Sequence, residues 1–542
     1  MSYAMPMITT GYRQMKGCIL AAGQGSRMGP MGDVTHKALL PLGNQAIISH
    51  IIRALGPHLS YVVAVSPERG DAIRDYLALA HPDLDVAFVT VKHHAGPGSG
   101  PGQSLYECRH LLQEPFYFVA CDTIVTQPLP DCDENWLGIK AVADPARFCT
   151  VVLDHQQQVT AVENGGIRSN QAFIGLAFVK DYIPFWEALA HDASLHKGEK
   201  QVNQGLAGLI PHRLRGIPMA WLDTGTEESY RQALEKFEKN LTFYGKTTDI
   251  TYRFDDKIIK YFKPDGVARR RFERGKNQPG VFVETLEARG CFFSTRFIQN
   301  ARLFSAALNH SATLRFLQWV QENLWQRREP EAGDFSEACT LFYADKTIAR
   351  LVAYDKRFPE HESNANMIIN GRSCQPARKL MARLLPAFYT TGIASGYHGD
   401  LHGDNILIDA QGDYRLIDWR DGFGPLTHVG DLYYDLAKFL HTLELSVEVM
   451  DTGNYALTHH TGEVHLEHRI SWSQLDALMG FDEFVQRNGY NPRRIRIIDA
   501  LIFLNMAPLY DDTMAVYLYH LGRYLLQGMA DQDHGQQFFQ ST

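Results

Sequence analysis

The chain has 542 residues, of which 45% are hydrophobic and 21% are charged, and its formal net charge is −8. This length exceeds what one hydrophobic core usually serves, so two domains or three are expected, and the composition excludes wholesale disorder. The negative net charge disfavours a nucleic-acid scaffold, so any phosphate-bearing ligand must be met by local Arg, Lys or Mg²⁺.

The eight cysteines are scattered and form no Cys-x-x-Cys pair, which favours reduced thiols over disulfides or a zinc site. No apolar run reaches the length of a membrane span, and residues 1–15 lack the apolar stretch of a signal peptide. We therefore expect a cytoplasmic, soluble protein that associates with neither membranes nor nucleic acid. The oligomeric state stays open.

After a flexible tail over 1–15, short apolar runs alternate with stretches of helical apolar spacing. Strands are expected over 16–22, 61–65, 86–91 and 116–121, and helices over 46–55, 71–80 and 105–112. This alternation predicts an α/β domain over 16–241, with a Rossmann-like, mixed and mostly parallel sheet covered on both faces. In such sheets ligands bind at the carboxyl ends of the strands, where Gly23 and Asp122 fall.

A charged helix over 227–241 and a linker over 242–249 are expected to lead into a second domain over 250–542. Its first part favours a hairpin over 250–262, a basic helix over 267–274 and a strand over 291–298. A sheet-rich lobe (about 250–310) before a helical lobe (about 311–542) predicts an α+β, two-lobed, kinase-like domain. The arginine clusters at 269–271 and 493–496 are expected on solvated helix faces.

A glycine-rich turn follows the first strand, where residues 20–28 read Leu-Ala-Ala-Gly-Gln-Gly-Ser-Arg-Met. The backbone amides of such a turn, free of Cβ atoms, can wrap a triphosphate. Arg27 and Lys37 would then stabilise the charge that builds on the α-phosphate and on the departing pyrophosphate. Asp122, at a strand end, and Asp223, within the Trp-Leu-Asp-Thr-Gly-Thr segment, are the expected Mg²⁺ ligands.

These motifs resemble the nucleotidyltransferases that join an NTP to a phosphorylated small molecule and release pyrophosphate. The glycine-rich turn with Lys37 is similar to the family's opening motif, and residues 221–226 are similar to the closing motif of its sugar-1-phosphate members. The resemblance covers about 16–240 and implies CTP or UTP as the NTP. It implies the following nucleotide-binding residues, the last two from a base-recognition loop: Leu20, Ala21, Ala22, Gly23, Gly25, Ser26, Gly102 and Gln103.

One segment departs from this family. Many sugar-phosphate members carry a lysine after a glutamate to hold the acceptor phosphate, whereas this chain has Asn164 after Glu163. A hexose-1-phosphate and a choline-phosphate-like acceptor therefore both stay open.

A second motif lies near residue 400, where residues 398–405 read His-Gly-Asp-Leu-His-Gly-Asp-Asn and Leu-Ile-Asp-Trp follows. Phosphoryl transfer from Mg-ATP needs a carboxylate that orients and deprotonates the attacking hydroxyl, a role that suits Asp400. Asn405 and Asp418 would hold the Mg²⁺.

The rival interpretation of this motif is a metal site built from His398, His402 and Asp404. Two embedded glycines argue against the helix that such a site needs, and Asn405 and Asp418 would be left unexplained. We expect His398 to brace the loop instead.

The spacing of Asp400, Asn405 and Asp418 resembles the aminoglycoside phosphotransferase and choline kinase family, over about 250–540. The chain lacks the Gly-x-Gly-x-x-Gly, Asp-Phe-Gly and Ala-Pro-Glu motifs of protein kinases. The resemblance implies that Lys260 holds the ATP phosphates and pairs with Glu273, with Glu284 as the rival.

Together the two motifs predict a bifunctional enzyme that uses Mg²⁺ at both sites. The C-terminal domain would phosphorylate a sugar or amino alcohol with ATP, and the N-terminal domain would couple the product to an NTP. Fusion raises the local concentration of the intermediate. The resemblance implies a role in cell-surface polysaccharide or cell-wall metabolism.

Two alternatives remain. A choline or polyol kinase coupled to CTP-dependent transfer would give a CDP-alcohol, and aromatic residues such as Trp419 and Tyr433 could then cage a quaternary ammonium. A regulatory protein with one inactive domain would lack a metal ligand at one site, and the sequence shows no such loss.

Overall fold

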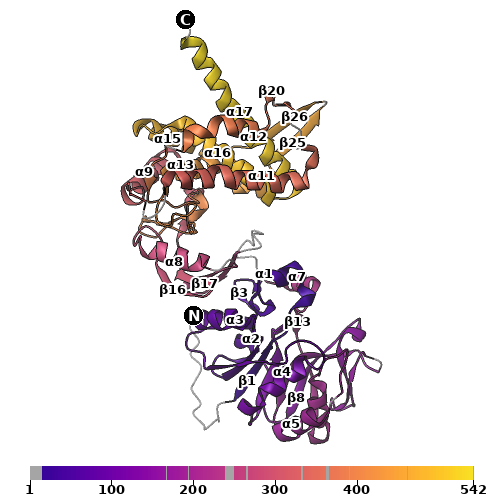
Figure 1. Cartoon of the computed structure of the whole chain (residues 1–542). Helices are drawn as coiled ribbons and strands as arrows, with labels where there is room; N and C mark the ends of the chain where they lie inside the picture. The colour runs from indigo at the N-terminus through magenta and orange to yellow at the C-terminus, as the bar shows by residue number, and fades with distance from the viewer. Residues whose placement is uncertain are drawn as a thin grey trace. The chain divides into compact units, whose positions relative to one another are not determined.

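The computed structural model describes residues 15–540, except 167, 193, 238–248, 264–265, 331–333, 362–364, 390 and 461 (Figure 1). The expected tail and the expected linker over 242–249 therefore lie almost wholly outside the described residues. The chain divides into two compact units. The N-terminal unit comprises residues up to 269 and 286–297, and the C-terminal unit comprises 270–285 and 298–542.

A nine-stranded mixed sheet is the centre of the described N-terminal unit. Its main path runs β10-β9-β11-β6-β1-β4-β5, and β8 and β12 extend it beside β11. The neighbours β6, β1, β4 and β5 are parallel, whereas β11 is antiparallel to β6. The strands are β1 (Lys16–Ala21), β4 (Ser60–Val65), β5 (Val86–Thr90), β6 (Phe116–Ala120), β8 (Asn135–Ala141), β9 (Cys149–Leu153), β10 (Val159–Asn164), β11 (Gln171–Val179) and β12 (Leu214–Pro218).

Helices cover both faces of this sheet, because successive side chains of a strand point to opposite faces. Ile19 and Ala21 join the core that contains α2 (Ile47–Leu55) and α3 (Gly70–Ala80). Cys18 and Leu20 join a second core on the opposite face, with α4 (Pro101–Glu107), α5 (Tyr182–His191) and α6 (Asn203–Gly208). Figure 1 shows these two groups of helices on either side of β1. The predicted doubly covered α/β architecture is confirmed.

A four-stranded sheet of order β14-β15-β17-β16 begins where the second domain was expected. It consists of β14 (Asp249–Arg253), β15 (Lys257–Phe262), β16 (Thr285–Arg289) and β17 (Phe292–Arg296). Tyr252 and Tyr261 belong to the same apolar core as Ile19, and their hydroxyls donate to the carbonyls of Leu39 (2.5 Å) and Val34 (3.0 Å). The expected small lobe of the kinase is thus packed as part of the N-terminal unit.

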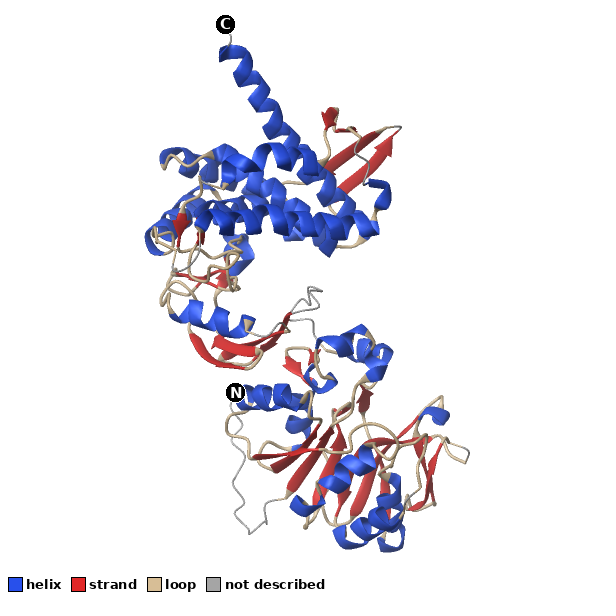
Figure 2. Ribbon diagram, in the orientation of Figure 1, coloured by secondary structure: helices blue, strands red, loops and turns tan. Residues whose placement is uncertain are grey.

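The C-terminal unit is mostly helical, and a hairpin of β25 (Tyr455–His460) and β26 (Glu463–His468) lies at its edge (Figure 2). Its helices include α9 (His310–Asn323), α11 (Lys346–Arg357), α12 (Ala377–Leu384), α13 (Leu432–Glu444), α15 (Trp472–Arg487), α16 (Pro492–Met506) and α17 (Asp512–Gln540). Helix α13 is buried on nearly every side and packs against α15 and α16. Helix α8 (Val267–Lys276) crosses the boundary between the two units.

The C-terminal unit contains a π-helical turn and a buried arginine. A six-residue π-helical turn, η7 (Thr340–Asp345), leads directly into α11. The expectation of solvated arginines is wrong for Arg494, which is buried and pairs with the buried Asp431 at 2.5 Å. Among the described helices, none has the length and apolar character to cross a membrane.

Candidate active sites

The glycine-rich turn lies open at the carboxyl end of β1. Gly25 has a φ of 72°, a left-handed conformation that suits glycine, and the Met28 amide donates to its carbonyl oxygen at 3.0 Å. No atom lies within 4 Å of where a Cβ would stand on Gly23 or Gly25. The side chains of Leu20, Ala21 and Ala22 are buried, whereas Gly23, Ser26 and Arg27 are exposed. The turn can therefore present backbone atoms and Arg27 to a ligand.

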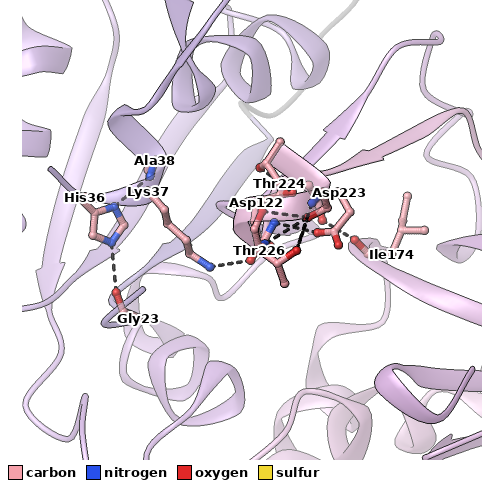
Figure 3. Close-up of polar contacts among 12 residues, drawn as sticks. Gly23, His36, Lys37, Ala38, Asp122, Ile174, Asp223, Thr224 and Thr226 are labelled. Carbon is pink, nitrogen blue, oxygen red and sulfur yellow. Dashed lines mark hydrogen bonds and ion pairs between the residues drawn. The ribbon is translucent and has the colours of Figure 1, made fainter. Parts of the chain in front are cut away.

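Lys37 and Asp122 form a close ion pair in the N-terminal site. Lys37 lies in the 3₁₀ turn η2 (Lys37–Leu39), and its Nζ is 2.5 Å from Oδ2 of Asp122 (Figure 3). Burial opposes both charges, but each partner stabilises the other, so the pKa of Lys37 is raised and that of Asp122 is lowered. Arg27 is near enough to lower the pKa of Asp122 further.

His36, which the sequence analysis missed, joins the glycine turn to Lys37. Its Nε2 is 3.2 Å from the carbonyl oxygen of Gly23, and its Nδ1 accepts from the amide of Ala38 at 3.1 Å (Figure 3). Burial and the nearby Lys37 lower its pKa to about 4. The only sequence signal for this role is its position next to Lys37.

Strand register brings Asp223 to Asp122. Strand β13 (Trp221–Asp223) pairs antiparallel with β7 (Thr123–Val125), with Asp223 opposite Thr123. The amide and the hydroxyl of Thr224 both donate to the Asp122 carbonyl oxygen at 3.0 Å. A Cβ on Gly225 would stand 3.1 Å from an oxygen of each carboxylate, so a side chain at this position would crowd both.

This carboxylate pair suits a divalent cation bound together with a nucleotide. Burial, and then the Asp122 charge, raise the pKa of Asp223, so a bound cation would stabilise its ionised form. Mg²⁺ is commonly held by one or two carboxylates plus substrate phosphates. Within the described part of the chain, no three His, Cys, Asp or Glu side chains group closely enough to hold a metal alone. The donor set therefore fits Mg²⁺ that arrives with its NTP.

The predicted base-recognition residues are engaged within the protein. The Gly102 amide donates to the Lys200 carbonyl oxygen at 2.9 Å, and a Cβ on Gly102 would stand 2.4 Å from the Gln201 carbonyl oxygen. Gln103 donates to Glu107 on the same helix at 3.1 Å. A role for Gly102 and Gln103 in nucleotide binding stays a prediction.

In the C-terminal unit, a buried carboxylate organises the second motif. Asp435 on α13 accepts hydrogen bonds from the amides of His398 and Gly399, both at 2.7 Å, and from the Trp325 indole at 3.0 Å. Burial nevertheless raises its pKa to about 6. Because Asp435 fixes the backbone just before Asp400, it sets the direction of that side chain.

The three predicted catalytic and metal-binding residues of this site lie together. The Asn405 amide group donates to the Asp400 carbonyl oxygen at 2.9 Å, and its own backbone carbonyl accepts from Ile417, the residue before Asp418. Strands β22 (Ile406–Ile408) and β23 (Tyr414–Leu416) form the hairpin that holds Asn405 and Asp418 at its open end. The Asn405 side-chain oxygen is the atom suited to Mg²⁺.

His398 acts as the expected brace. Its Nε2 is 2.8 Å from the Ile417 carbonyl oxygen, and its Nδ1 accepts from the Asp400 amide at 3.1 Å. Burial lowers its pKa to about 3. Since both ring nitrogens are used, the rival interpretation of His398 as a metal ligand finds no support.

Lys260 and its expected partners fall in different units. Lys260 lies on β15 in the N-terminal unit, whereas Glu273 and Glu284 lie in the C-terminal unit. Their pairing and their contacts with ATP stay predictions.

A lysine that the sequence analysis did not select contacts the predicted base. The Nζ of Lys438 on α13 is 2.9 Å from Oδ1 of Asp400. No motif announces this residue, because it lies on the helix after the motif hairpin and is brought to Asp400 by packing.

The two sites define a chain with two domains for phosphorus chemistry, one for nucleotidyl transfer and one for phosphoryl transfer. Residues 17–130 match the model of the MobA-like NTP transferase domain, and residues 301–461 match that of the Phosphotransferase enzyme family. The chain thus carries a nucleotidyltransferase domain followed by a kinase-like phosphotransferase domain, as predicted.

Individual relatives each match less than half of the chain. Bifunctional protein GlmU of Methanocaldococcus jannaschii is 21% identical over 254 residues, which cover 45% of this chain and 58% of that protein. Glucose-1-phosphate thymidylyltransferase of Neisseria gonorrhoeae is 26% identical over 243 residues, 40% of this chain and 81% of that protein. A solved structure of UDP-glucose pyrophosphorylase with UDP-glucose is 16% identical over 41% of this chain and 98% of that one, with a TM-score of 0.37. The chain spans little more than half the length of the GlmU relative.

Proposed function

We propose that this chain is a bifunctional enzyme that makes a nucleotide-activated building block in two consecutive steps. The C-terminal domain phosphorylates a small hydroxylated molecule with ATP, and the N-terminal domain joins that phosphate ester to an NTP with release of pyrophosphate. The observation that carries the proposal is that each unit assembles its own carboxylate site: Asp122 with Asp223, and Asp400 with Asn405 and Asp418.

In the kinase step, Asp400 orients the acceptor hydroxyl and takes its proton. The hydroxyl oxygen forms a bond to the γ-phosphorus of ATP, and the bond to the ADP oxygen breaks. Lys438, 2.9 Å from Asp400, is placed to stabilise the phosphoryl group during transfer. Asn405 and Asp418 would hold Mg²⁺, which would neutralise charge on the polyphosphate.

In the transfer step, a phosphate oxygen of the acceptor attacks the α-phosphorus of the NTP, and pyrophosphate leaves. The glycine turn binds the triphosphate through its backbone, while Lys37 and Arg27 stabilise the charge that develops on it. Mg²⁺ held by Asp122 and Asp223 would neutralise the same phosphates. His36 keeps the turn and Lys37 in a fixed relation.

A sugar is the favoured acceptor. The thymidylyltransferase relative is named for glucose 1-phosphate, and the Trp-Leu-Asp-Thr-Gly-Thr segment supports the same class. The choline alternative needs open aromatic faces, but Trp419 is buried with its indole donating to Arg271, and Tyr433 lies under the Arg494 guanidinium. Uridylyl, cytidylyl or thymidylyl transfer to the sugar phosphate would serve cell-surface polysaccharide or cell-wall metabolism.

Two substitutions test the independence of the sites. Asp400→Asn should lower acceptor-dependent ADP formation by roughly a thousandfold or more, because the acceptor hydroxyl loses its base. It should leave pyrophosphate release from a supplied sugar phosphate unchanged. Lys37→Ala should lower pyrophosphate release and leave acceptor-dependent ADP formation unchanged. Each variant is the control for the other, measured on the full chain by separate ADP and pyrophosphate assays.

The proposal of two working sites fails if both activities disappear together in either variant while the thermal unfolding profile stays that of the wild type. It also fails if neither variant affects its own reaction.

A further inference from the structure

Positive charge surrounds the predicted base of the kinase. Three cationic side chains lie near Asp400, namely Lys346 on α11, Arg420 after the motif hairpin and Lys438 on α13, and a fourth, Arg350 on α11, lies near Lys346 and Arg420. We call them the cation cluster. Arg420 is fixed to the catalytic loop, because its Nε donates to the Gly399 carbonyl oxygen at 2.8 Å.

One aromatic ring gathers two members of this cluster. The Phe342 ring centroid is 4.2 Å from Nζ of Lys346 and 5.6 Å from Cζ of Arg420. Phe342 belongs to the π-helical turn η7, and it is itself held between Phe423 and Tyr434 at centroid distances of 4.2 and 4.8 Å. Cation–π attraction of about 0.5–2 kcal/mol per contact offsets part of the repulsion between the two cations.

The protein supplies little negative charge in return. Within the described residues, Lys346 and Arg350 form no ion pair. Of the nearby carboxylates, Asp421 pairs with Arg270, and Asp435 is used by the amides of the loop. Burial, followed by the charges of Arg420, Arg350 and Lys438, lowers the pKa of Lys346 well below its usual value. Asp400 and the proposed metal ligand Asp418 together do not balance four cations.

The position of the cluster points to the acceptor. An acceptor hydroxyl must come within hydrogen-bond reach of Asp400, so the rest of that molecule falls among the side chains around Asp400. The residues assigned to ATP and Mg²⁺ are others, namely Lys260, Asn405 and Asp418. Arginine forks match carboxylate and phosphate groups, and such charge-assisted hydrogen bonds are the strong ones.

Resting on the proposed kinase activity, we propose that the acceptor carries an anionic group, either a carboxylate or a phosphate ester, bound by Lys346, Arg350 and Arg420. The acceptor hydroxyl then reaches Asp400, and its oxygen bonds to the γ-phosphorus as ADP leaves. The proton passes to Asp400, and the anionic group is unchanged by the reaction. Lys438 stays with Asp400 and the transferred phosphoryl group.

Acceptor pairs that differ in charge provide the first test. The full chain is assayed for ADP release with an aldose and its uronic acid, an alditol and its aldonic acid, sugar monophosphates with free hydroxyls, and amino alcohols. The acidic or phosphorylated member of each pair should show a kcat/KM at least about tenfold above its neutral partner. Amino alcohols should be the poorest acceptors. Comparison of the sugar acids with the sugar monophosphates shows whether the site prefers a carboxylate or a phosphate ester.

Variants of α11 provide the second test. Lys346→Met and Arg350→Gln should each raise the KM for the preferred acidic acceptor by about tenfold, with little change in the KM for ATP. Lys346→Arg should keep most of the preference. Lys356→Met, at the exposed end of the same helix, is the matched control and should change neither constant.

The outcomes separate the two proposals. If neutral acceptors match or exceed acidic ones, or if the α11 variants leave the KM for acidic acceptors unchanged, the anionic-acceptor inference is wrong and the kinase assignment stands. If no acceptor of any class stimulates ADP release, the proposed kinase function itself fails, and this inference fails with it.

Discussion

The two candidate active sites use a histidine in the same way. His36 and His398 each accept a backbone amide two residues ahead at Nδ1, and each places Nε2 against a carbonyl oxygen. Because an amide can only donate and a carbonyl can only accept, both rings are neutral with the proton on Nε2. In both sites the histidine therefore fixes the backbone and does not act as an acid or base.

The charged side chains around His36 and those around His398 differ in their balance of positive and negative charge. In the N-terminal site, the carboxylates of Asp122 and Asp223 stand with Lys37 and Arg27, so anions and cations are equal in number. In the C-terminal site, the carboxylates of Asp400 and Asp418 stand with the four members of the cation cluster. The equal charges of the first site suit the proposed binding of a metal together with a triphosphate. The excess of positive charge in the second site suits the proposed anionic acceptor.

We predict that the β14–β17 sheet folds only together with the rest of the N-terminal unit. Tyr252 is fully buried there and packs edge-on against Tyr76 on α3 at 4.8 Å. Tyr252→Ala should destabilise the N-terminal unit by about 3–5 kcal/mol, as expected for a large buried ring. Denaturant unfolding, followed with the pyrophosphate assay, measures the loss.

Tyr252→Phe is the matched control, since it removes only the hydroxyl that bonds to Leu39 and should cost about 1 kcal/mol. The midpoint is the denaturant concentration at which half of the pyrophosphate-releasing activity is lost. If Tyr252→Ala does not change this midpoint, the sheet is not part of the N-terminal core.

A buried acid in the C-terminal unit should make the stability of that unit depend on pH. Asp499 on α16 is fully buried 3.4 Å from Nδ1 of His441, and burial raises its pKa to about 8. The folded state therefore holds a proton that the unfolded chain loses near pH 4, so stability falls as the pH rises toward 8. Burial lowers the pKa of His441, which gives the opposite slope only below its usual value of 6.5.

Between pH 6.5 and 8 only Asp499, of these two residues, changes the free energy of unfolding with pH. Over this range the free energy of unfolding of the wild type should fall by about 2 kcal/mol, whereas that of Asp499→Asn should not. Unfolding of the full chain at the two pH values, read from the C-terminal transition, measures the difference. Equal losses in both proteins would mean that Asp499 is ionised in the fold.

The smallest predicted effect concerns the glycine turn. Gly25→Ala places a side chain at a φ of 72°, with a strain of about 1 kcal/mol and a narrower approach for the triphosphate. The KM for the NTP should rise about five- to tenfold. Gly453→Ala carries the same kind of strain at a φ of 67°, also with open space around it, and should leave that KM unchanged. Equal effects in the two variants would contradict a nucleotide-binding turn.

Local patterns were enough to predict the sheet, the two motifs and the grouping of Asp400, Asn405 and Asp418. Alternating apolar residues determine strands, and a short hairpin necessarily brings its two ends together. The adjacency of Asp122 and Asp223 follows from the pairing of β7 with β13, about a hundred residues apart in the chain, and only family order suggested it.

Long-range packing explains what was missed. The only sequence feature that points to His36 is its position next to Lys37. The sequence places Arg494 in a cluster of arginines typical of a surface, and only the fold brings it to its buried partner Asp431. Lys346 and Arg350 precede the motif by some fifty residues, and only packing brings Lys346 near Asp400 and Arg350 near Arg420. The residues proposed to bind the anionic group of the acceptor are thus outside the motif that predicts the kinase-like domain.

The π-helical turn before α11 has an evolutionary consequence. A π-helical turn holds about one residue more than an α-helical turn over the same rotation, so η7 can absorb an inserted residue while α11 keeps its direction. A one-residue deletion in η7 is therefore expected to leave Lys346 and Arg350 facing as they do, whereas a deletion between these two residues would change the angle between their side chains by about 100°. Changes of chain length are thus better tolerated in this turn than in the helix that follows it.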